Sequence, residues 1–222
     1  MDAIITAAGR NSRMIADFRK KNKKPIHKLK LEINNKPILI HTIEKTLNSE
    51  VNQVIIALGH YKEEIYELLK EYNLNKNVKI KVNSNVDVGL SKTILNCLED
   101  NLDENYIYLA GDQPTITTNT INNLINTLEN SPNPKNTISI LARRDIGKLD
   151  SAEGLGMPFA CYGRLLYNYI KNENQNLNPI LRRMIRDNVE FYGIKKENDL
   201  ELKNINHYND YLFVKNKIEK WI

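Results

Sequence analysis

Short apolar runs without polar alternation recur along the chain, and segments with helical spacing of apolar residues stand between them. Runs of this kind are typical of strands that are buried on both faces of a parallel sheet. They lie at residues 3–5 and 54–58, and further strands are predicted at 78–82, 106–110 and 137–142. The helical segments lie at 38–47, 61–72, 92–98 and 117–128. This alternation predicts an α/β fold with three layers and a mostly parallel, doubly wound, Rossmann-like sheet.

The last third of the chain predicts further strands and helices and ends in a helix. The expected strands lie at 158–162 and 189–194, and the expected helices at 165–170, 179–185 and 208–221. Thr117 or Thr118 is the expected N-cap of the preceding helix, because a threonine hydroxyl accepts a hydrogen bond from a free N–H of the first helical turn.

Two stretches interrupt the periodicity and predict loops. Residues 14–25 lose apolar spacing and gain charge, which predicts an exposed loop, and residues 15–27 together predict a basic flap after the first turn. Apolar residues alternate over 29–33, which predicts a short strand beyond the flap. Residues 143–157 are polar and contain glycine, and they predict a long loop of the kind that lines an active site.

The composition fits one soluble domain over residues 1–222. A chain of this length is long enough for one α/β domain with a large core. A hydrophobic content of 41% with 27% charged residues is ordinary for a globular protein. The chain has no apolar run near the roughly 20 residues that span a bilayer and no pattern of a secretory leader. We therefore expect no membrane partner and a cytoplasmic location.

The charged residues, cysteines and histidines narrow the classes of partner. The net charge is +5, but much of the excess lies within 19–28 rather than along a face with interleaved aromatic residues, so no nucleic-acid partner is expected. This basic stretch is either a solvated loop or a local site for an anion. Cys97 and Cys161 are isolated in sequence and predict core residues. The four histidines lack the spacing of zinc ligands.

The first predicted strand runs into a turn of small residues that suits a phosphate. The turn is Thr6-Ala7-Ala8-Gly9, and Ser12 and Arg13 follow it. Small side chains leave backbone N–H groups open to an anion, while the hydroxyl and the guanidinium add donors. A plain tight turn is the alternative; a dinucleotide fingerprint lacks its second and third glycines. Asp112 follows the fourth strand, and ligands of open α/β sheets bind beyond the carboxyl ends of strands, so Asp112 and this turn should share one rim.

Five separated segments resemble the molybdenum-cofactor nucleotidyltransferases, the MobA-like and MocA-like NTP transferases, within the nucleotide-diphospho-sugar transferase fold. The segments are 6–14, Lys28 with Asn35-Lys36-Pro37, Gly89-Leu90-Ser91, Gly111-Asp112-Gln113-Pro114 and Asn204-Ile205-Asn206. They follow the family's order and extend over nearly the whole chain. One departure is that the signature arginine and the basic residue matching Lys28 are usually closer together, so 15–27 looks like an insertion.

The resemblance implies a Mg²⁺-dependent enzyme that transfers CMP or GMP from an NTP to a phosphorylated small molecule and releases pyrophosphate. It implies catalytic roles for Arg13, Lys28 and Asp112, and a metal site at Asp112 and Asn206. The nucleotide-binding residues that it implies are Ala7, Ala8, Gly9, Ser12, Arg13, Lys28, Gly89 and Ser91. Gly156 and Pro158 fall where the family binds its acceptor.

The sequence is less informative about the acceptor and about the base of the nucleotide than about the type of reaction. The leading acceptor is molybdopterin or a related cofactor, and the alternative is a sugar phosphate or another phosphorylated metabolite. Thr-Ala-Ala-Gly with Gly89-Leu90-Ser91 resembles the cytidylyl-transferring branch more than the guanylyl-transferring one. A nucleotide-binding protein without turnover is a further alternative. Asp112 as a turn cap, and Asn204 and Asn206 as surface residues, are the structural alternatives. The sequence does not specify the oligomeric state.

Overall fold

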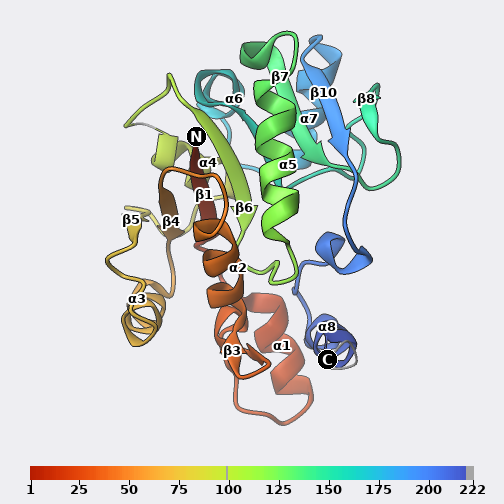
Figure 1. The fold of residues 1–222 in the computed structure, drawn as a ribbon. Coiled ribbons are helices and arrows are strands. Elements are labelled where there is room, and N and C mark those ends of the chain that lie inside the picture. Colours follow the sequence, from red (N-terminus) through yellow and green to blue (C-terminus); the bar gives the residue numbers. More distant parts are fainter. Residues whose placement is uncertain (99, 219–222) are drawn as a thin grey trace.

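The computed structural model of the protein describes residues 1–98 and 100–218. Its centre is an eight-stranded sheet in the order β5-β4-β1-β6-β9-β7-β10-β8 (Figure 1). The strands are β1 (Asp2–Ala7), β4 (Val54–Leu58), β5 (Val78–Val82), β6 (Asn105–Ala110), β7 (Thr137–Leu141), β8 (Gly147–Leu149), β9 (Phe159–Tyr162) and β10 (Glu190–Ile194). The helices are α1 (Ser12–Lys20), α2 (Ile38–Leu47), α3 (Lys62–Glu71), α4 (Leu90–Leu98), α5 (Thr118–Glu129), α6 (Gly163–Ile170), α7 (Leu177–Arg186) and α8 (Tyr208–Ile218).

The sheet is parallel in its first half and mixed in its second. Strand β1 pairs in parallel with β4 and with β6, and β4 pairs in parallel with β5. Strand β9 is antiparallel to both of its neighbours, β6 and β7. Strand β10 is parallel to β7, and β8 is antiparallel to β10. The predicted α/β, mostly parallel and doubly wound sheet is therefore confirmed, with β8 and β9 as the antiparallel members.

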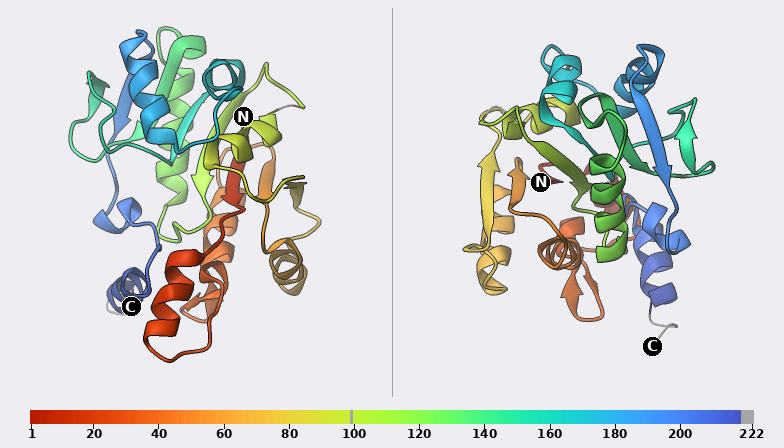
Figure 2. Two further views of the ribbon diagram at one scale, coloured as in Figure 1. Left: turned by 180° about the vertical axis from the view of Figure 1, so that it is seen from behind. Right: turned by 45° about the horizontal axis from the view of Figure 1, so that its top comes forward.

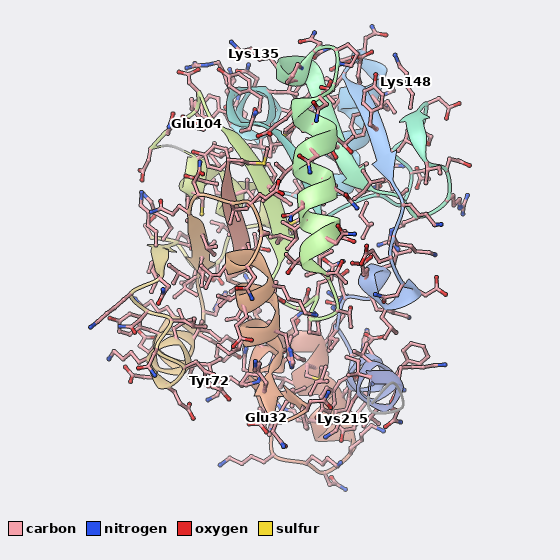
Figure 3. The ribbon with its side chains drawn as sticks, viewed as in Figure 1. Glu32, Tyr72, Glu104, Lys135, Lys148 and Lys215 are labelled. Carbon is pink, nitrogen blue, oxygen red and sulfur yellow. The ribbon has the colours of Figure 1, made fainter. Side chains whose placement is uncertain are left out.

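Helices cover both faces of the sheet, which explains the continuous apolar runs of the central strands. Side chains of successive strand residues point to opposite faces. Ile4 and Ile5 are both 0% exposed; Ile4 belongs to the core under α4, α6 and α7, and Ile5 to the core under α2, α3 and α5. The two helical layers are seen from opposite sides in Figures 1 and 2. Charged side chains such as Glu104, Lys135 and Lys148 lie at the outer surface (Figure 3).

Most predicted elements are found close to their predicted bounds. Strand β4 matches 54–58, and the predicted cap at Thr117 is confirmed, because its hydroxyl accepts the Thr120 N–H at 3.1 Å. Cys97 and Cys161 are buried core residues, as predicted. Helix α8 ends at Ile218 in the described residues; the predicted positions 219–221 lie outside them. No helix in residues 1–98 and 100–218 is long and apolar enough to cross a membrane.

The prediction of an exposed loop over 14–25 is wrong for its first half. Residues 12–20 form α1, and Met14 and Phe18 are buried while the helix carries its charges outward. The Phe18 ring packs against Tyr208 of α8 with centroids 5.1 Å apart. Two apolar residues four positions apart lie on one face of a helix and are enough to dock a short one. The lysines and arginines around them obscure this apolar spacing in the sequence. Only the part after α1 is an exposed basic segment.

Two other predicted segments differ in detail. The expected strand over 29–33 is a 3-10 turn, Lys28–Lys30, followed by the two-residue strand β2 (Glu32–Ile33), which pairs with β3 (Lys36–Pro37). Burial of alternate apolar residues produced the strand-like pattern there. The expected loop at 143–157 contains β8, which has only three residues, Gly-Lys-Leu, and is mostly exposed at the edge of the sheet, so apolar periodicity could not reveal it.

Candidate active site

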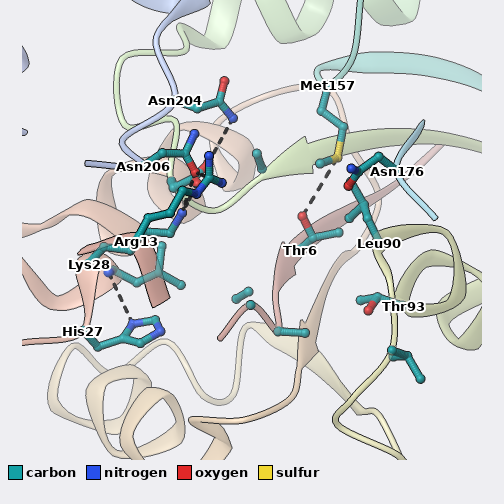
Figure 4. Close-up of a pocket in the computed structure, with 17 residues that line it drawn as sticks. Thr6, Arg13, His27, Lys28, Leu90, Thr93, Met157, Asn176, Asn204 and Asn206 are labelled. Carbon is teal, nitrogen blue, oxygen red and sulfur yellow. Dashed lines mark hydrogen bonds and ion pairs between the residues drawn. The ribbon is translucent and has the colours of Figure 1, made fainter. Parts of the chain in front are cut away.

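A cavity of about 380 Å³ lies beyond the carboxyl ends of β1 and β6 (Figure 4). Strand β1 supplies its glycine turn, β6 supplies Asp112, and α1, α4, α7 and the segment before α8 complete the wall. The lining residues are Thr6, Ala7, Ala8, Gly9, Arg13, His27, Lys28, Leu29, Val88, Leu90, Thr93, Ala110, Asp112, Met157, Asn176, Asn204 and Asn206. The predicted shared rim of the turn and Asp112 is therefore present.

One end of the cavity holds a cluster of charged and amide groups. The Lys28 ammonium forms an ion pair with Asp112 and lies 3.2 Å from the Asn206 Oδ1. The Arg13 Nη2 donates to the same Asn206 oxygen at 2.8 Å, although the two residues are 193 positions apart. The Asn204 Nδ2 donates to the other Asp112 oxygen at 3.1 Å. The fold thus brings Arg13, Lys28, Asp112 and Asn206 together.

The segment that carries Asn204 and Asn206 is fastened to the loop after β6. Its backbone joins the loop where the Ile205 N–H donates to the Asp112 carbonyl at 2.9 Å. Upstream of it lies a 3-10 turn, η3 (Asp199–Leu202), in which Glu201 is 0% exposed. The Glu201 carboxylate accepts the backbone N–H and the hydroxyl of Thr117, each at 2.9 Å, and the Glu197 N–H at 2.7 Å. These bonds hold the backbone that leads to Asn204 and Asn206 in place next to Asp112.

The glycine turn is tied to the segment that precedes Lys28. Asn11 adopts a left-handed conformation, with φ 56°. Its side-chain Nδ2 donates to the Ile26 carbonyl at 3.2 Å, and its Oδ1 accepts the Lys28 N–H at 3.3 Å. On the other side of the turn, a side chain at Gly59 would lie 2.7 Å from the Ala8 carbonyl, so glycine there lets the turn after β4 pack directly against the phosphate-type turn.

The opposite end of the cavity is uncharged. Val88 and Leu90 contribute apolar side chains, and Thr93 and Asn176 contribute a hydroxyl and an amide. The Thr93 hydroxyl accepts a hydrogen bond from Asn83 at 3.0 Å. Figure 4 shows Asn176 and Met157 on the side away from Lys28 and Arg13. The cavity therefore offers cations at one end and neutral polar groups with apolar flanks at the other.

Several predicted site residues do not line this cavity. Ser12 is exposed in the first turn of α1. Ser91 is buried, and its hydroxyl accepts the Gln175 N–H at 3.0 Å. A side chain at Gly89 would come within 2.9 Å of the Asn174 backbone. Both residues therefore hold the α4 wall against Asn174 and Gln175. Gly156 and Pro158 flank Met157, which does line the cavity.

Four of the lining residues carry no specific signal in the sequence. His27, Thr93, Met157 and Asn176 belong to no motif. Asn176 cannot be singled out because the chain is rich in asparagine. His27 cannot be singled out because it lies in the apparent insertion. The position of His27 directly before Lys28 was the one available clue.

The Asp112 and Asn206 oxygens fit a hard divalent cation. In this structure the positive Lys28 ammonium lies against both oxygens, which shows that the pair forms a place for a cation. Carboxylate and amide oxygens are the ligands that Mg²⁺ prefers. The described part of the chain has no group of three or more His, Cys, Asp or Glu side chains that could hold a metal ion. A cation between Asp112 and Asn206 would thus take its remaining ligands from water and substrate.

These features define the class of protein. A small-residue turn, two cations and an acid-amide pair at the carboxyl ends of a doubly wound sheet are typical of α/β proteins that bind a nucleotide. Residues 3–189 match the family model described as the MobA-like NTP transferase domain, and the chain belongs to this family of nucleotidyltransferases. The match ends before the segment with Asn204 and Asn206, so their place in the site rests on the structure.

Similar proteins with assigned names support the assignment to the nucleotidyltransferases. A nucleotidyl transferase from Methanothermobacter is 34% identical, superposes with a TM-score of 0.90, and is matched over 100% of this chain and 98% of its own. The 2-C-methyl-D-erythritol 4-phosphate cytidylyltransferase of Lachnoclostridium phytofermentans is 29% identical over 69% of this chain and 61% of its own length. The bifunctional protein GlmU of Thermoanaerobacter pseudethanolicus is 34% identical over 55% of this chain and 24% of its own. This chain spans less than two thirds of either curated relative.

Proposed function

We propose that the protein transfers CMP from CTP to a small phosphorylated acceptor of the polyol-phosphate or sugar-phosphate type, with release of pyrophosphate. The observation that carries this proposal is the cluster of Arg13, Lys28, Asp112 and Asn206 at one end of a cavity that begins at the glycine turn. The neutral end of the same cavity suits a base and a sugar. Together the two ends match the charge pattern of a nucleoside triphosphate.

The reaction needs two anionic reactants to meet. An oxygen of the acceptor phosphate attacks the α-phosphorus of CTP, a new P–O bond forms, and the bond between the α-phosphorus and the bridging oxygen breaks, so that pyrophosphate leaves with the electron pair. Backbone N–H groups of the glycine turn and the Arg13 guanidinium bind the β- and γ-phosphates, and Lys28 neutralises charge along the chain of phosphates. No side chain needs to act as a covalent nucleophile, because the acceptor phosphate is itself the nucleophile.

Asp112 and Asn206 are the residues that would hold Mg²⁺. The ion would supply charge neutralisation at the phosphates. Asn204 orients Asp112 through its hydrogen bond to Oδ1, which leaves Oδ2 turned toward Lys28 and Asn206. Because Asn206 is uncharged, this site carries one negative charge rather than two, and metal binding should depend strongly on the phosphates of the nucleotide.

The relatives favour a polyol or sugar phosphate over molybdopterin as the acceptor. The name of the Lachnoclostridium protein describes a cytidylyltransferase for a methylerythritol phosphate. The sequence at the glycine turn also resembles the cytidylyl-transferring branch. We place the acceptor beside Met157 and Asn176, between the Gly156-Pro158 segment and α7, with the amide of Asn176 available for an acceptor hydroxyl.

Pyrophosphate release with a panel of acceptors tests this proposal. The protein is incubated with Mg²⁺, either CTP or GTP, and 2-C-methyl-D-erythritol 4-phosphate, sugar 1-phosphates or molybdopterin, and the CMP or GMP adduct is identified by mass. We expect an adduct with CTP and a polyol or sugar phosphate. Turnover with molybdopterin alone, or with GTP alone, would overturn the proposed substrates. Nucleotide binding without pyrophosphate release in every arm would overturn the proposal that the protein is an enzyme.

A further inference from the structure

His27 forms part of the wall between the nucleotide cavity and a second cavity. Its ring lines the first cavity together with Gly9 and Lys28. On the other side lies a cavity of about 520 Å³, which is also lined by Asn11, Lys24 and Tyr61. His27 is only 6% exposed, and its ring packs on Tyr61 with centroids 4.4 Å apart. Figure 4 shows the ring below Lys28, at the edge of the cavity.

The hydrogen on this ring is fixed by its neighbours. The Leu29 N–H donates to the His27 Nδ1 at 3.3 Å, so Nδ1 is an acceptor and the hydrogen of the neutral ring is on Nε2. Burial, and next the positive charge of Lys28, lower the pKa of His27 to about 4. The ring is therefore an uncharged Nε2–H donor near neutral pH.

This donor has no hydrogen-bond partner among the described residues, although it is buried. The backbone of Gly9 interacts with the ring, at a geometry that falls short of a hydrogen bond. Buried donors without partners are rare, because each has lost water and gained nothing in return. Neighbouring polar groups of the turn are already used: Asn11 is bonded to Ile26 and Lys28, and the Arg10 carbonyl accepts the Tyr61 hydroxyl at 3.4 Å. A ligand oxygen bound in the Gly9 turn would supply the acceptor that this donor lacks.

We propose that His27 is a phosphate-binding residue, whose uncharged Nε2–H donates to an oxygen of the triphosphate held at the Gly9 turn. The proposal rests on the proposed function only in requiring a phosphate chain in that turn. An uncharged donor adds a directed bond without adding a third cation beside Arg13 and Lys28. Three cations would hold pyrophosphate more tightly after transfer, whereas a neutral donor helps to orient the triphosphate and still lets the product leave.

Two substitutions separate this role from a structural one. In His27→Asn the side-chain oxygen keeps the role of accepting the Leu29 N–H, as asparagine does at N-caps, but the side chain no longer reaches the Nε2 position. In His27→Gln the longer amide restores an N–H near the Nε2 position. If His27 served only to fix the local backbone, asparagine would be the harmless change and glutamine the harmful one.

The probe is inorganic tripolyphosphate, measured by isothermal titration calorimetry with Mg²⁺, because it tests the phosphate contact without the base or the acceptor. For His27→Asn we expect binding about tenfold weaker at an unchanged stoichiometry, as for the loss of one hydrogen bond to a charged group, and His27→Gln should recover most of it. The stoichiometry reports the folded fraction, so misfolding cannot imitate a weaker Kd. Equal affinity of wild type and His27→Asn, or no recovery in His27→Gln, would overturn the proposal.

A parallel titration with CTP distinguishes the two proposals. Tripolyphosphate binding that depends on His27, in a protein that does not bind CTP, supports the phosphate contact and overturns the cytidylyltransferase. CTP turnover that is the same in wild type and in His27→Asn, with equal KM values, supports the enzyme and overturns the role of His27.

Discussion

Replacing Lys28 with methionine should tighten the binding of a free metal ion while weakening the binding of nucleotide. In the structure the Lys28 ammonium lies against the Asp112 carboxylate and the Asn206 oxygen, the two groups that we propose as metal ligands. The Lys28 and Asp112 side chains are only 16% and 13% exposed, so solvent screens this pair weakly. A metal ion that enters must first displace the ammonium, and methionine removes that competitor while it keeps an unbranched side chain of similar length.

The size of the effect follows from the contacts. A hydrogen bond between charged groups contributes about 1.5–3 kcal/mol, and the bond to the Asn206 amide adds a smaller amount. Taking about 2 kcal/mol as the cost of displacing Lys28, the metal should bind about 30-fold more tightly to Lys28→Met than to wild type in the absence of nucleotide. The same substitution removes a cation from the triphosphate, so CTP should bind about 10- to 100-fold more weakly.

Electron paramagnetic resonance of free Mn²⁺ measures the first quantity, and calorimetry with CTP the second. The matched control is Lys30→Met, which removes the same charge two residues away; Lys30 pairs with Glu64 at 3.1 Å and does not line the nucleotide cavity. Metal binding that is no tighter in Lys28→Met than in both wild type and Lys30→Met would refute the reasoning. So would a parallel change of metal and nucleotide affinity in the same direction.

Three further predictions concern catalysis, stability and pH. Asp112→Asn should slow pyrophosphate release about 100-fold or more while the protein stays folded, and a rate equal to that of wild type would contradict its role. Glu201→Gln should lower the free energy of unfolding in urea by about 3 kcal/mol, because a buried charge with three hydrogen bonds is lost; the exposed Glu197→Gln should change it by less than about 1 kcal/mol. Because burial lowers the pKa of His27 from 6.5 to about 4, the neutral ring stabilises the fold fully above pH 6.5, and this stability is lost as the pH falls toward 4. Wild type should thus lose about 3 kcal/mol more than His27→Asn between pH 7 and pH 4 in urea titrations, and equal losses would show that His27 titrates normally.

The sequence predicts the central strands well, because burial on both faces leaves a pattern that tertiary contacts do not override. Residues 54–58 of β4 are all buried and read as one apolar run. The short helix α1 could not be predicted in the same way. Its docking buries Met14 and Phe18 and depends on the contact of Phe18 with Tyr208, which lies 190 positions further along the chain. A local pattern of charged residues gives no sign of such a contact.

The residues that line the cavity could be predicted where a motif carries them, and not where only packing brings them there. Arg13, Lys28, Asp112 and Asn206 meet in one cavity, as the resemblance implied. Gly89 and Ser91 belong to an equally clear motif, but their contacts are with residues 174 and 175. A motif does not state whether its residues face a ligand or a neighbouring loop. Thr93 and Asn176 lie at the neutral end of the cavity, and ordinary polar residues of this kind gain meaning only from the three-dimensional arrangement.

The late position of the Asn204–Asn206 segment has a consequence for synthesis of the protein. The cluster joins Arg13 to Asn206 across nearly the full length of the chain, and Glu201 fastens the segment to Thr117. A nascent chain on the ribosome can pair β1, β4 and β6 and expose its glycine turn long before Asn206 emerges. The contacts of Asn206 with Arg13 and Lys28 form only after residue 206 has left the exit tunnel. The proposed cation site is therefore completed late in the synthesis of residues 1–206.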